Sequence, residues 1–382
     1  MKKIILVIAL QLLAGFCPSF GQSDKKEKIS LLLGGDIFFA ETYQTKLESK
    51  GEKNILKAYG YEYCLLKIGP LLKRADQVIA NLETPLTDTS QSPFTEDNKY
   101  RIHKGDIKNT PATLKLYNIN VVSLANNHSM DYGKGGLYQT MQTLKDNSIS
   151  YFGVGLNETE ASLPYQLNYR LGNKNFNIII IGGLDYSKKY DTLYHFYAGN
   201  NSAGVKAWKR KKVIEQIESI RSTDKAAFII AFPHWFENYV WKTEDQSELA
   251  HAMIDAGADM VAGHGTHMFQ EVELYKNKWI VYSLGNLAFN APGRYKKKET
   301  HPYSFLAMLE ILENKNIQLI NLRLYPILSD NLITNYQPRF VTETEIQTVH
   351  DLLNSHSVNI NLKKDYELGK DETGYFINLK IH

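Results

Sequence analysis

Short apolar runs separated by amphipathic stretches constrain the fold of this chain more than any other feature. The runs with the composition of buried strands are ISLLL (29–33), QVIA (77–80), NVVSLA (120–125), FNIIII (176–181), AAFIIAF (226–232), DMVAG (259–263) and WIVYSL (279–284). Helical patterns lie between them, and in one of these Leu137, Met141 and Leu144 share a face. Strands that alternate with helices predict an α/β protein.

Two later apolar segments indicate that the sheets are mixed. Residues 305–312 and 317–328 flank an Asn314-Lys315-Asn316 turn, which is typical of an antiparallel pair. An antiparallel pair beside parallel strands predicts mixed sheets. The more polar residues 331–382 are interpreted as a C-terminal appendage.

The amino terminus has the pattern of a secretory signal. Lys2 and Lys3 precede an apolar stretch over residues 4–16, which is shorter than the ~20 residues that a membrane span needs. Small residues follow this stretch and predict cleavage near Gly21–Gln22, so residues 1–21 are expected to be a signal peptide. We therefore expect an exported chain, in the periplasm or outside the cell.

Export is expected to be the only encounter with a membrane. Lipoprotein anchoring at Cys17 is the weaker alternative, because the bulky Phe16 precedes this cysteine. Residues 22–28 are interpreted as a solvated linker. After cleavage only Cys64 remains, within an apolar helical pattern, and it is interpreted as a packed small hydrophobe.

The charge of the chain limits its partners. The formal net charge is +3, so no strong basic field indicates nucleic acid or an anionic membrane surface. Lysine-rich runs at 209–212 and 294–298 are typical of solvated faces. The second run follows a loop expected near the strand ends, so it retains a chance of meeting an anionic substrate. The sequence leaves the oligomeric state open.

Polar side chains that bind metals or transfer protons follow six of the predicted strands. These side chains are Asp36, Asn81, Glu83, Asn126, Asn127, His128, His234, His264, His267 and Asn286. Parallel strands present their carboxyl ends on one rim, so these groups are expected to converge. Carboxylate, amide and imidazole ligands without thiolate suit Zn, Mn, Fe or Mg.

Convergence of these groups predicts a site for two divalent metals that activate a scissile bond. We expect a carboxylate such as Glu83 to bridge the metals, and His264 and His267 to hold one of them. A neighbouring histidine without metal is expected to protonate the leaving group. Each group alone has a simpler explanation, because an Asp after a strand is usually a turn residue and a buried His is usually a hydrogen-bonded core residue.

Several of these segments resemble the CapA family of poly-γ-glutamate capsule biosynthesis proteins, in the calcineurin-like metallophosphoesterase superfamily. The matching stretches are GGD (34–36), NLETPLT (81–87), VVSLANNHSMDYGKGGLYQT (121–140), GVGLNETEASLP (153–164), FPHW (232–235), GADMVAGHGTHMFQEVE (257–273) and VYSLGNLAF (281–289). The resemblance implies two packed mixed β-sheets flanked by helices, a four-layer metallophosphoesterase-like sandwich over residues 29–330.

The resemblance also implies roles for individual residues. The metal ligands that it implies are Asp36, Glu83, Asn127, His234, His264 and His267. His128 would be the general acid, and Asn126 and Asp131 would shape its loop.

The sequence departs from the family pattern at four places. Phe236 and Asn238 stand where the family usually has Gly and Glu, and Gly265 replaces the middle histidine of GHHPH. Asp36 is followed by Ile37 and Phe38, so the superfamily's Asp-x-His motif is absent. The departures in the histidine segments bear on substrate identity and on turnover, and the missing motif histidine bears on how firmly one metal is held.

Three functions remain open from the sequence. The first is a two-metal hydrolase that acts on a phosphoester or a γ-glutamyl amide. The second is a non-catalytic accessory protein that binds an anionic capsule polymer for export or anchoring and keeps a structural metal. The third is an extracellular binding domain without metal, which requires the strand-end clusters to be coincidental.

Overall fold

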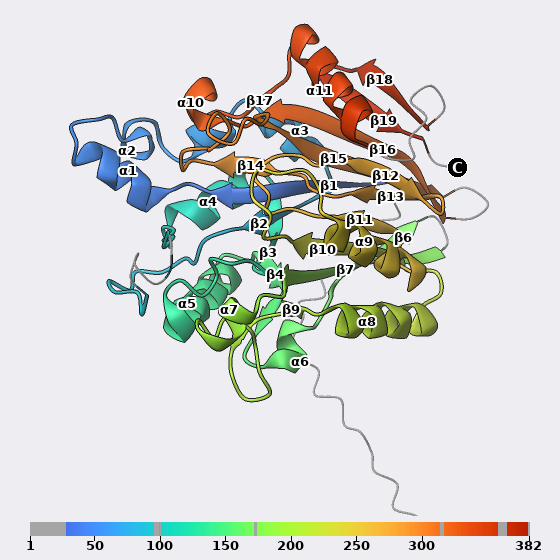
Figure 1. The fold of residues 1–382 in the computed structure, drawn as a ribbon, viewed down its shortest axis with the longest axis horizontal. Helices are drawn as coiled ribbons and strands as arrows, with labels where there is room; N and C mark the ends of the chain where they lie inside the picture. Colours follow the sequence, from blue (N-terminus) through green and yellow to red (C-terminus); the bar gives the residue numbers. More distant parts are fainter. Residues whose placement is uncertain are drawn as a thin grey trace, which may run out of the picture.

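A computed structural model describes residues 28–94, 99, 101–171, 174–313, 317–357 and 365–380 (Figure 1). The predicted signal peptide, Cys17 and the predicted turn at 314–316 lie outside the described residues. So does the predicted linker, except for Lys28, which begins the first strand. Among the described residues, no helix is both long and apolar enough to cross a bilayer.

The larger sheet has ten strands within the described residues. They are β1 (Lys28–Phe38), β2 (Gln77–Leu82), β3 (Ile119–Ser123), β4 (Ser150–Phe152), β14 (Asn286–Phe289), β15 (Tyr303–Glu313), β16 (Ile317–Leu328), β17 (Arg339–Phe340), β18 (Tyr366–Lys370) and β19 (Tyr375–Leu379). Strands β1 to β4 and β14 pair in parallel, whereas β15 pairs antiparallel with β1 and with β16. The predicted antiparallel pair is therefore confirmed.

The smaller sheet has seven strands within the same described residues. They are β6 (Tyr165–Leu171), β7 (Lys174–Asp185), β9 (Ala207–Trp208), β10 (Phe228–His234), β11 (Met260–Ala262), β12 (Val272–Tyr275) and β13 (Lys278–Val281). Its central strands β7, β10, β11 and β13 are parallel, and β6 and β12 are antiparallel at its edges. A separate pair joins β5 (Val154–Gly155) to β8 (Gly204–Val205).

Alternating residues on the strands hold the two sheets face to face. Ile29, Leu31 and Leu33 of β1 lie in one buried cluster with Ile178 and Ile180 of β7. The residues between them point to the other faces, as expected from the two-residue period of a strand. This apolar core is the centre of the sandwich.

Helices cover the outer face of each sheet. The helices and the single 3-10 helix over the larger sheet are α2 (Ile55–Tyr59), η1 (Glu62–Leu65), α3 (Gly69–Arg74), α4 (Asn109–Leu116) and α5 (Gly133–Asp146), and those over the smaller sheet are α8 (Arg210–Thr223) and α9 (Glu244–Asp255). The layers, helix–sheet–sheet–helix, confirm the predicted fold class (Figure 1). Cys64 is buried in the helical layer over the larger sheet, as predicted.

Residues after 330 extend the larger sheet. Strand β19 pairs with β16 and β18 pairs with β19, and α11 (Glu343–His356) places Val349 and Leu353 in the core between the sheets. Strands β18 and β19 are not evident from the sequence, because their alternation of apolar and polar residues is weak. The remaining short helices are α1 (Glu41–Glu48), α6 (Glu158–Ala161), α7 (Lys188–Thr192) and α10 (Asn331–Thr334).

Candidate metal centre

Asp36 lies at the point where β1 changes its neighbour. Residues 28–33 pair with β15, whereas Asp36 pairs with Asn286 of β14. A Cβ at Gly35 would lie 1.7 Å from the carbonyl oxygen of Gly285, so only glycine permits this approach. The prediction that Asp36 follows the end of the strand is therefore wrong. Pairing with β14 extends β1 to Phe38, so Asp36 lies within the strand.

The other predicted ligands lie at the carboxyl ends of strands, as expected. Glu83 follows β2 directly, Asn127 follows β3, and His234 is the last residue of β10. His264 follows β11 and forms a parallel bridge with His234. The central strands of both sheets thus bring their ends to one edge of the sandwich.

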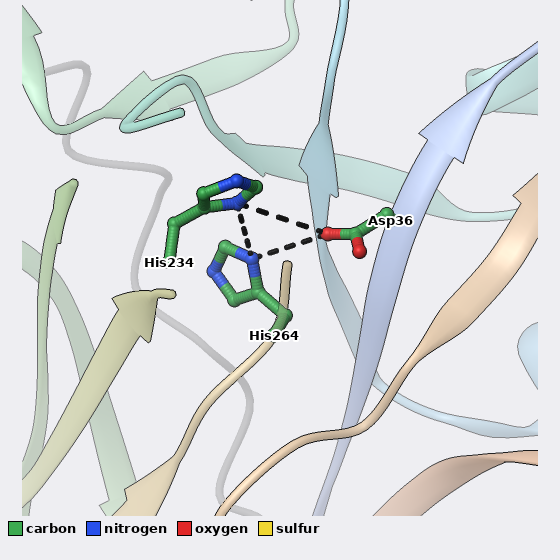
Figure 2. Close-up of side chains that lie close together, drawn as sticks. All are labelled: Asp36, His234 and His264. Carbon is green, nitrogen blue, oxygen red and sulfur yellow. Dashed lines mark hydrogen bonds and ion pairs between the residues drawn. The ribbon is translucent and has the colours of Figure 1, made fainter. Parts of the chain in front are cut away.

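The first group of donors consists of Asp36, His234 and His264, which converge from the two sheets (Figure 2). Nδ1 of His264 lies 3.2 Å from Asp36 Oδ1 and 3.1 Å from Nδ1 of His234. His234 Nδ1 lies 4.0 Å from the same carboxylate oxygen. One carboxylate oxygen and two imidazole nitrogens, all of which can donate a lone pair, therefore face one another. A bound cation stabilises such an arrangement.

The second group of donors consists of Asp36, Glu83 and His267. In each group the donor atoms lie within 4.8 Å of one another, and all five side chains are buried. Asp36, not Glu83, is common to both groups, and His264 and His267 belong to different groups. This differs from the expectation that Glu83 bridges two metals and that the two histidines share one.

Backbone conformation explains this separation of the two histidines. Gly265 has φ of 99° and His267 has φ of 65°, so the chain turns sharply between the imidazoles. A Cβ at Gly265 would lie 2.5 Å from the carbonyl oxygen of Trp235, which leaves no space for a side chain. The backbone N–H of Gly265 donates to Asp36 Oδ2 over 3.1 Å and helps to hold this carboxylate in place.

The donors that this site presents fit divalent metal ions. Glu83 Oε2, Asn127 Oδ1 and His264 Nε2 are buried and have no hydrogen-bond partner. Burial and the nearby Asp36 charge hold the pKa of Glu83 well above its usual value. Burial also acts to raise the pKa of Asp36, but its hydrogen bond to His264 and the histidine charges leave that pKa below its usual value. Bound cations would accept the lone pairs of these unpartnered atoms and would reduce the repulsion between the Asp36 and Glu83 carboxylates.

Asn126 holds the loop after β3 in place. Its amide donates to Asn81 Oδ1 and to the Leu82 carbonyl, at 3.0 and 2.8 Å. The side-chain oxygen of Asn126, Oδ1, accepts hydrogen bonds from the backbone N–H of His128 and from the Ser129 hydroxyl. These hydrogen bonds tie the loop after β3 to the end of β2.

His128 is oriented by a buried ion pair. Its Nδ1 lies 2.7 Å from Asp131 Oδ2, and Asp131 Oδ1 lies 2.6 Å from Lys99 Nζ. The other ring nitrogen, Nε2, lies 3.8 Å from Glu83 Oε1. Burial and then the Lys99 charge lower the pKa of His128 well below its usual value. The neutral imidazole therefore predominates at neutral pH in the free chain.

Further residues complete the environment of His128 and His267. His103 stacks on His128 at 3.4 Å between ring centroids, and its Nδ1 lies 3.0 Å from the Glu83 carbonyl oxygen. Asn286 Oδ1 lies 3.0 Å from His267 Nδ1, and Tyr295 bonds both Asn286 and the His267 carbonyl. Asn286 and Asn81 stood among the strand-end groups, but no sequence motif identified His103, Lys99 or Tyr295.

A cavity of about 200 Å³ opens beside these groups. Its lining residues are Lys99, Arg101, His103, Asn127, His128, Lys189, Tyr190, Tyr194, Phe236, Asn238, His267, Phe289 and Arg294. Four of them are cationic and none is a carboxylate. Of the lysine-rich run at 294–298, Arg294 reaches this cavity, whereas the lysines are exposed.

Comparison with known proteins identifies relatives of this chain. It is similar to the capsule biosynthesis protein CapA of Bacillus anthracis, with 29% identity over 270 residues, covering 70% of this chain and 61% of that protein. The PGA biosynthesis protein CapA of Bacillus subtilis strain 168 is 30% identical over 257 residues, covering 67% and 62%. A probable polyglutamine synthesis accessory protein of Mycobacterium tuberculosis is 25% identical over 331 residues, covering 78% and 84%.

The chain spans less than two thirds of the length of the two Bacillus relatives that it matches. The family model described as bacterial capsule synthesis protein PGA_cap matches residues 30–291, which contain every predicted ligand and His128. That range is more than half of the chain and agrees with the extent of the resemblance seen in its motifs. The chain belongs to the bacterial capsule synthesis protein family PGA_cap.

Proposed function

We propose that this protein is an exported metal-dependent hydrolase of capsule or poly-γ-glutamate metabolism, which acts on a phosphoester or a γ-glutamyl amide. The observation that carries the proposal is the pair of buried donor groups that share Asp36 beside a cationic cavity. An anionic substrate fits a cavity with this charge.

The six predicted ligands would hold two divalent ions, drawn from Mn, Zn, Fe and Mg. Asp36, His234 and His264 form one half of the site, and Asp36, Glu83 and His267 form the other. Asn127 adds its unpartnered carbonyl oxygen. Ions bound there would supply Lewis-acid stabilisation of charge on the scissile group.

The proton chemistry is assigned to His128. Asp131 engages Nδ1, so Nε2 is the nitrogen that exchanges a proton with a substrate in the cavity. Burial and then the Lys99 charge lower the pKa of His128, and an anionic substrate in the cavity acts against the second of these causes. Protonated Nε2 then donates to the leaving oxygen or nitrogen as a general acid.

His128→Ala tests this assignment. General acid–base assistance typically contributes about 10²–10⁴-fold, so turnover of an alkyl phosphate or a γ-glutamyl amide should fall by that order. The loss should be much smaller with a nitrophenyl phosphate, whose leaving group needs no proton. Metal content, measured by mass spectrometry, should stay unchanged. His350→Ala on α11 is the matched control, because this histidine is partly exposed and does not line the cavity.

The second candidate is an accessory protein that binds an anionic polymer without cleaving it. Phe236 and Asn238 line the cavity, so the family's usual Gly and Glu are missing from the place where a substrate would lie. Absence of hydrolysis by the metal-loaded wild type on both substrate classes, with binding retained, would favour this candidate. Equal turnover by wild type and His128→Ala would remove His128 from the chemistry.

A further inference from the structure

Three cationic side chains line the cavity beyond the donor groups. Arg101 lies in the segment before α4, Lys189 lies in α7, and Arg294 lies in the loop after β14. The fold therefore brings three distant segments to one wall. None of these residues belongs to the motifs that carry the resemblance to the family.

Part of the positive charge of this wall, that of Lys189 and Arg294, is not balanced by an ion pair within the described residues. Lys99, the fourth cation of the cavity, is already paired with Asp131 at 2.6 Å. In the described part of the chain, no ion pair joins Lys189 or Arg294 to a carboxylate. Asn238 stands among the lining residues where a carboxylate would have neutralised part of the charge. The wall therefore offers positive charge to a ligand.

Arg294 is placed to bind an oxyanion. Its guanidinium carbon lies 4.9 Å from the centre of the Tyr239 ring, and that ring lies 5.2 Å from the His267 ring. The Nε atom of Arg294 is buried and has no hydrogen-bond partner. A buried N–H without an acceptor is costly, and the guanidinium edge pairs well with two oxygens of a carboxylate or phosphate.

We propose that Arg294, with Arg101 and Lys189, forms a subsite for a second anionic group of the ligand whose first anionic group lies at the metal centre. This inference rests on the proposed function in placing that first group. The ligand class is a molecule with two oxyanions, and both a bisphosphate and a γ-linked oligoglutamate belong to it. Arg294 is the specificity-determining residue of the subsite.

Calorimetric titration of the metal-loaded full chain tests the subsite in two arms. One arm compares propyl phosphate with propane-1,3-diol bisphosphate. The other arm compares a γ-linked glutamate pentamer with the same pentamer in which every carboxyl except the terminal γ-carboxyl is an amide, so that one carboxylate remains. Hydrogen bonds to charged groups contribute enough that Arg294→Gln should weaken binding of the bis-anionic ligand about 10- to 100-fold. Binding of the singly anionic partner should change by less than about threefold.

Matched variants keep this test independent of folding. Lys297→Gln removes the same charge from an exposed position of the same loop and should leave both affinities unchanged. Asn238→Glu adds a carboxylate to the cavity without removing a packed side chain, and it should also lower the affinity for the bis-anionic ligand. Arg294→Lys should retain part of the affinity, because it keeps the charge but loses the planar fork.

The outcomes separate the inference from the proposed function. A selective loss in the phosphate arm or in the glutamate arm supports the subsite and identifies its ligand, even if no hydrolysis is found. Equal affinities of wild type, Arg294→Gln and Asn238→Glu in both arms would overturn the subsite, even if His128-dependent hydrolysis is found.

Discussion

Two groups of neighbouring histidines in the described part of the molecule differ in what surrounds them. In the candidate metal centre, Nδ1 of His234 lies 3.1 Å from Nδ1 of His264. In the second cluster, Trp241 lies 3.8 Å from His356 and 5.1 Å from His301 between ring centroids. Each cluster contains an imidazole nitrogen that is buried without a partner, Nε2 of His264 and Nε2 of His301.

The neighbours separate the two clusters. Asp36 lies 3.2 Å from the His264 ring, whereas His301 packs against the rings of Phe269 and Tyr303. Among the described residues, groups of donors that can hold a metal occur in the first cluster and not in the second. Burial lowers the pKa of histidines in both clusters. A buried histidine with a lowered pKa therefore does not indicate a metal site unless carboxylates converge on it.

The largest expected effect is the loss of both metals in Asp36→Asn. Because Asp36 belongs to both donor groups, this change should reduce bound metal from about two ions to fewer than one. Hydrolysis should fall by about 10³-fold or more, since several kcal/mol of charge stabilisation are lost. Mass spectrometry of the purified variants measures the metal. His301→Gln should keep its metal, and loss of metal there would break the comparison.

The next effect is the response of stability to metal. A ligand that binds only the folded chain at 100 times its Kd raises the free energy of unfolding by ~2.7 kcal/mol per site. Chelation should therefore lower the stability of wild type and His301→Gln by similar amounts. Asp36→Asn should show almost no change, as measured by urea unfolding with and without chelator. An equal response in Asp36→Asn would place the metal elsewhere.

The third effect concerns pH and belongs to the second cluster. Burial lowers the pKa of His301 to about 3, whereas a histidine in an unfolded chain titrates near ~6.5. Between these values only the unfolded chain takes up the proton, so the free energy of unfolding falls as the pH drops. The His301 contribution amounts to about 2 kcal/mol at pH 5.

Urea unfolding of the metal-free chain at pH 8 and pH 5 measures that contribution. His301→Gln should lose less stability than wild type across this range. Identical losses in the two proteins would show that His301 is not held neutral by its surroundings.

The smallest effect is expected at His356. Its ring stacks on Trp241 with 16° between the planes, but the residue is exposed at the end of α11. An aromatic pair contributes about 0.5–1.5 kcal/mol to the free energy of unfolding. Because His356 is exposed, we expect His356→Ala to cost an amount near the lower end of this range. Thermal unfolding against His350→Ala on the same helix measures the difference. A loss of several kcal/mol would instead indicate that His356 anchors α11.

The sequence by itself determined the fold class and the candidate ligands. Strand and helix periods are local, and parallel strands bring their carboxyl ends to one edge whatever the loops do. For this reason Glu83, Asn127, His234 and His264 were predicted at the positions where the structure has them. The motifs also identified the family, and the structure confirmed the layered sandwich.

Only the tertiary structure decided how these groups are combined. The spacing of His264 and His267 suggested one shared metal, but left-handed backbone at Gly265 and His267 sends the rings to different donor groups. Asp36 became the shared carboxylate because β14 pairs with β1 beside it.

The cavity wall was decided in the same way. Lys99, Arg101, Lys189 and Arg294 come from separate loops and short elements, and no local period links them. Local patterns determine which residues end a strand, because each strand is specified by its own side chains. The contacts between loops depend on chain segments far apart in sequence, so the charge of the cavity exists only once both sheets have packed.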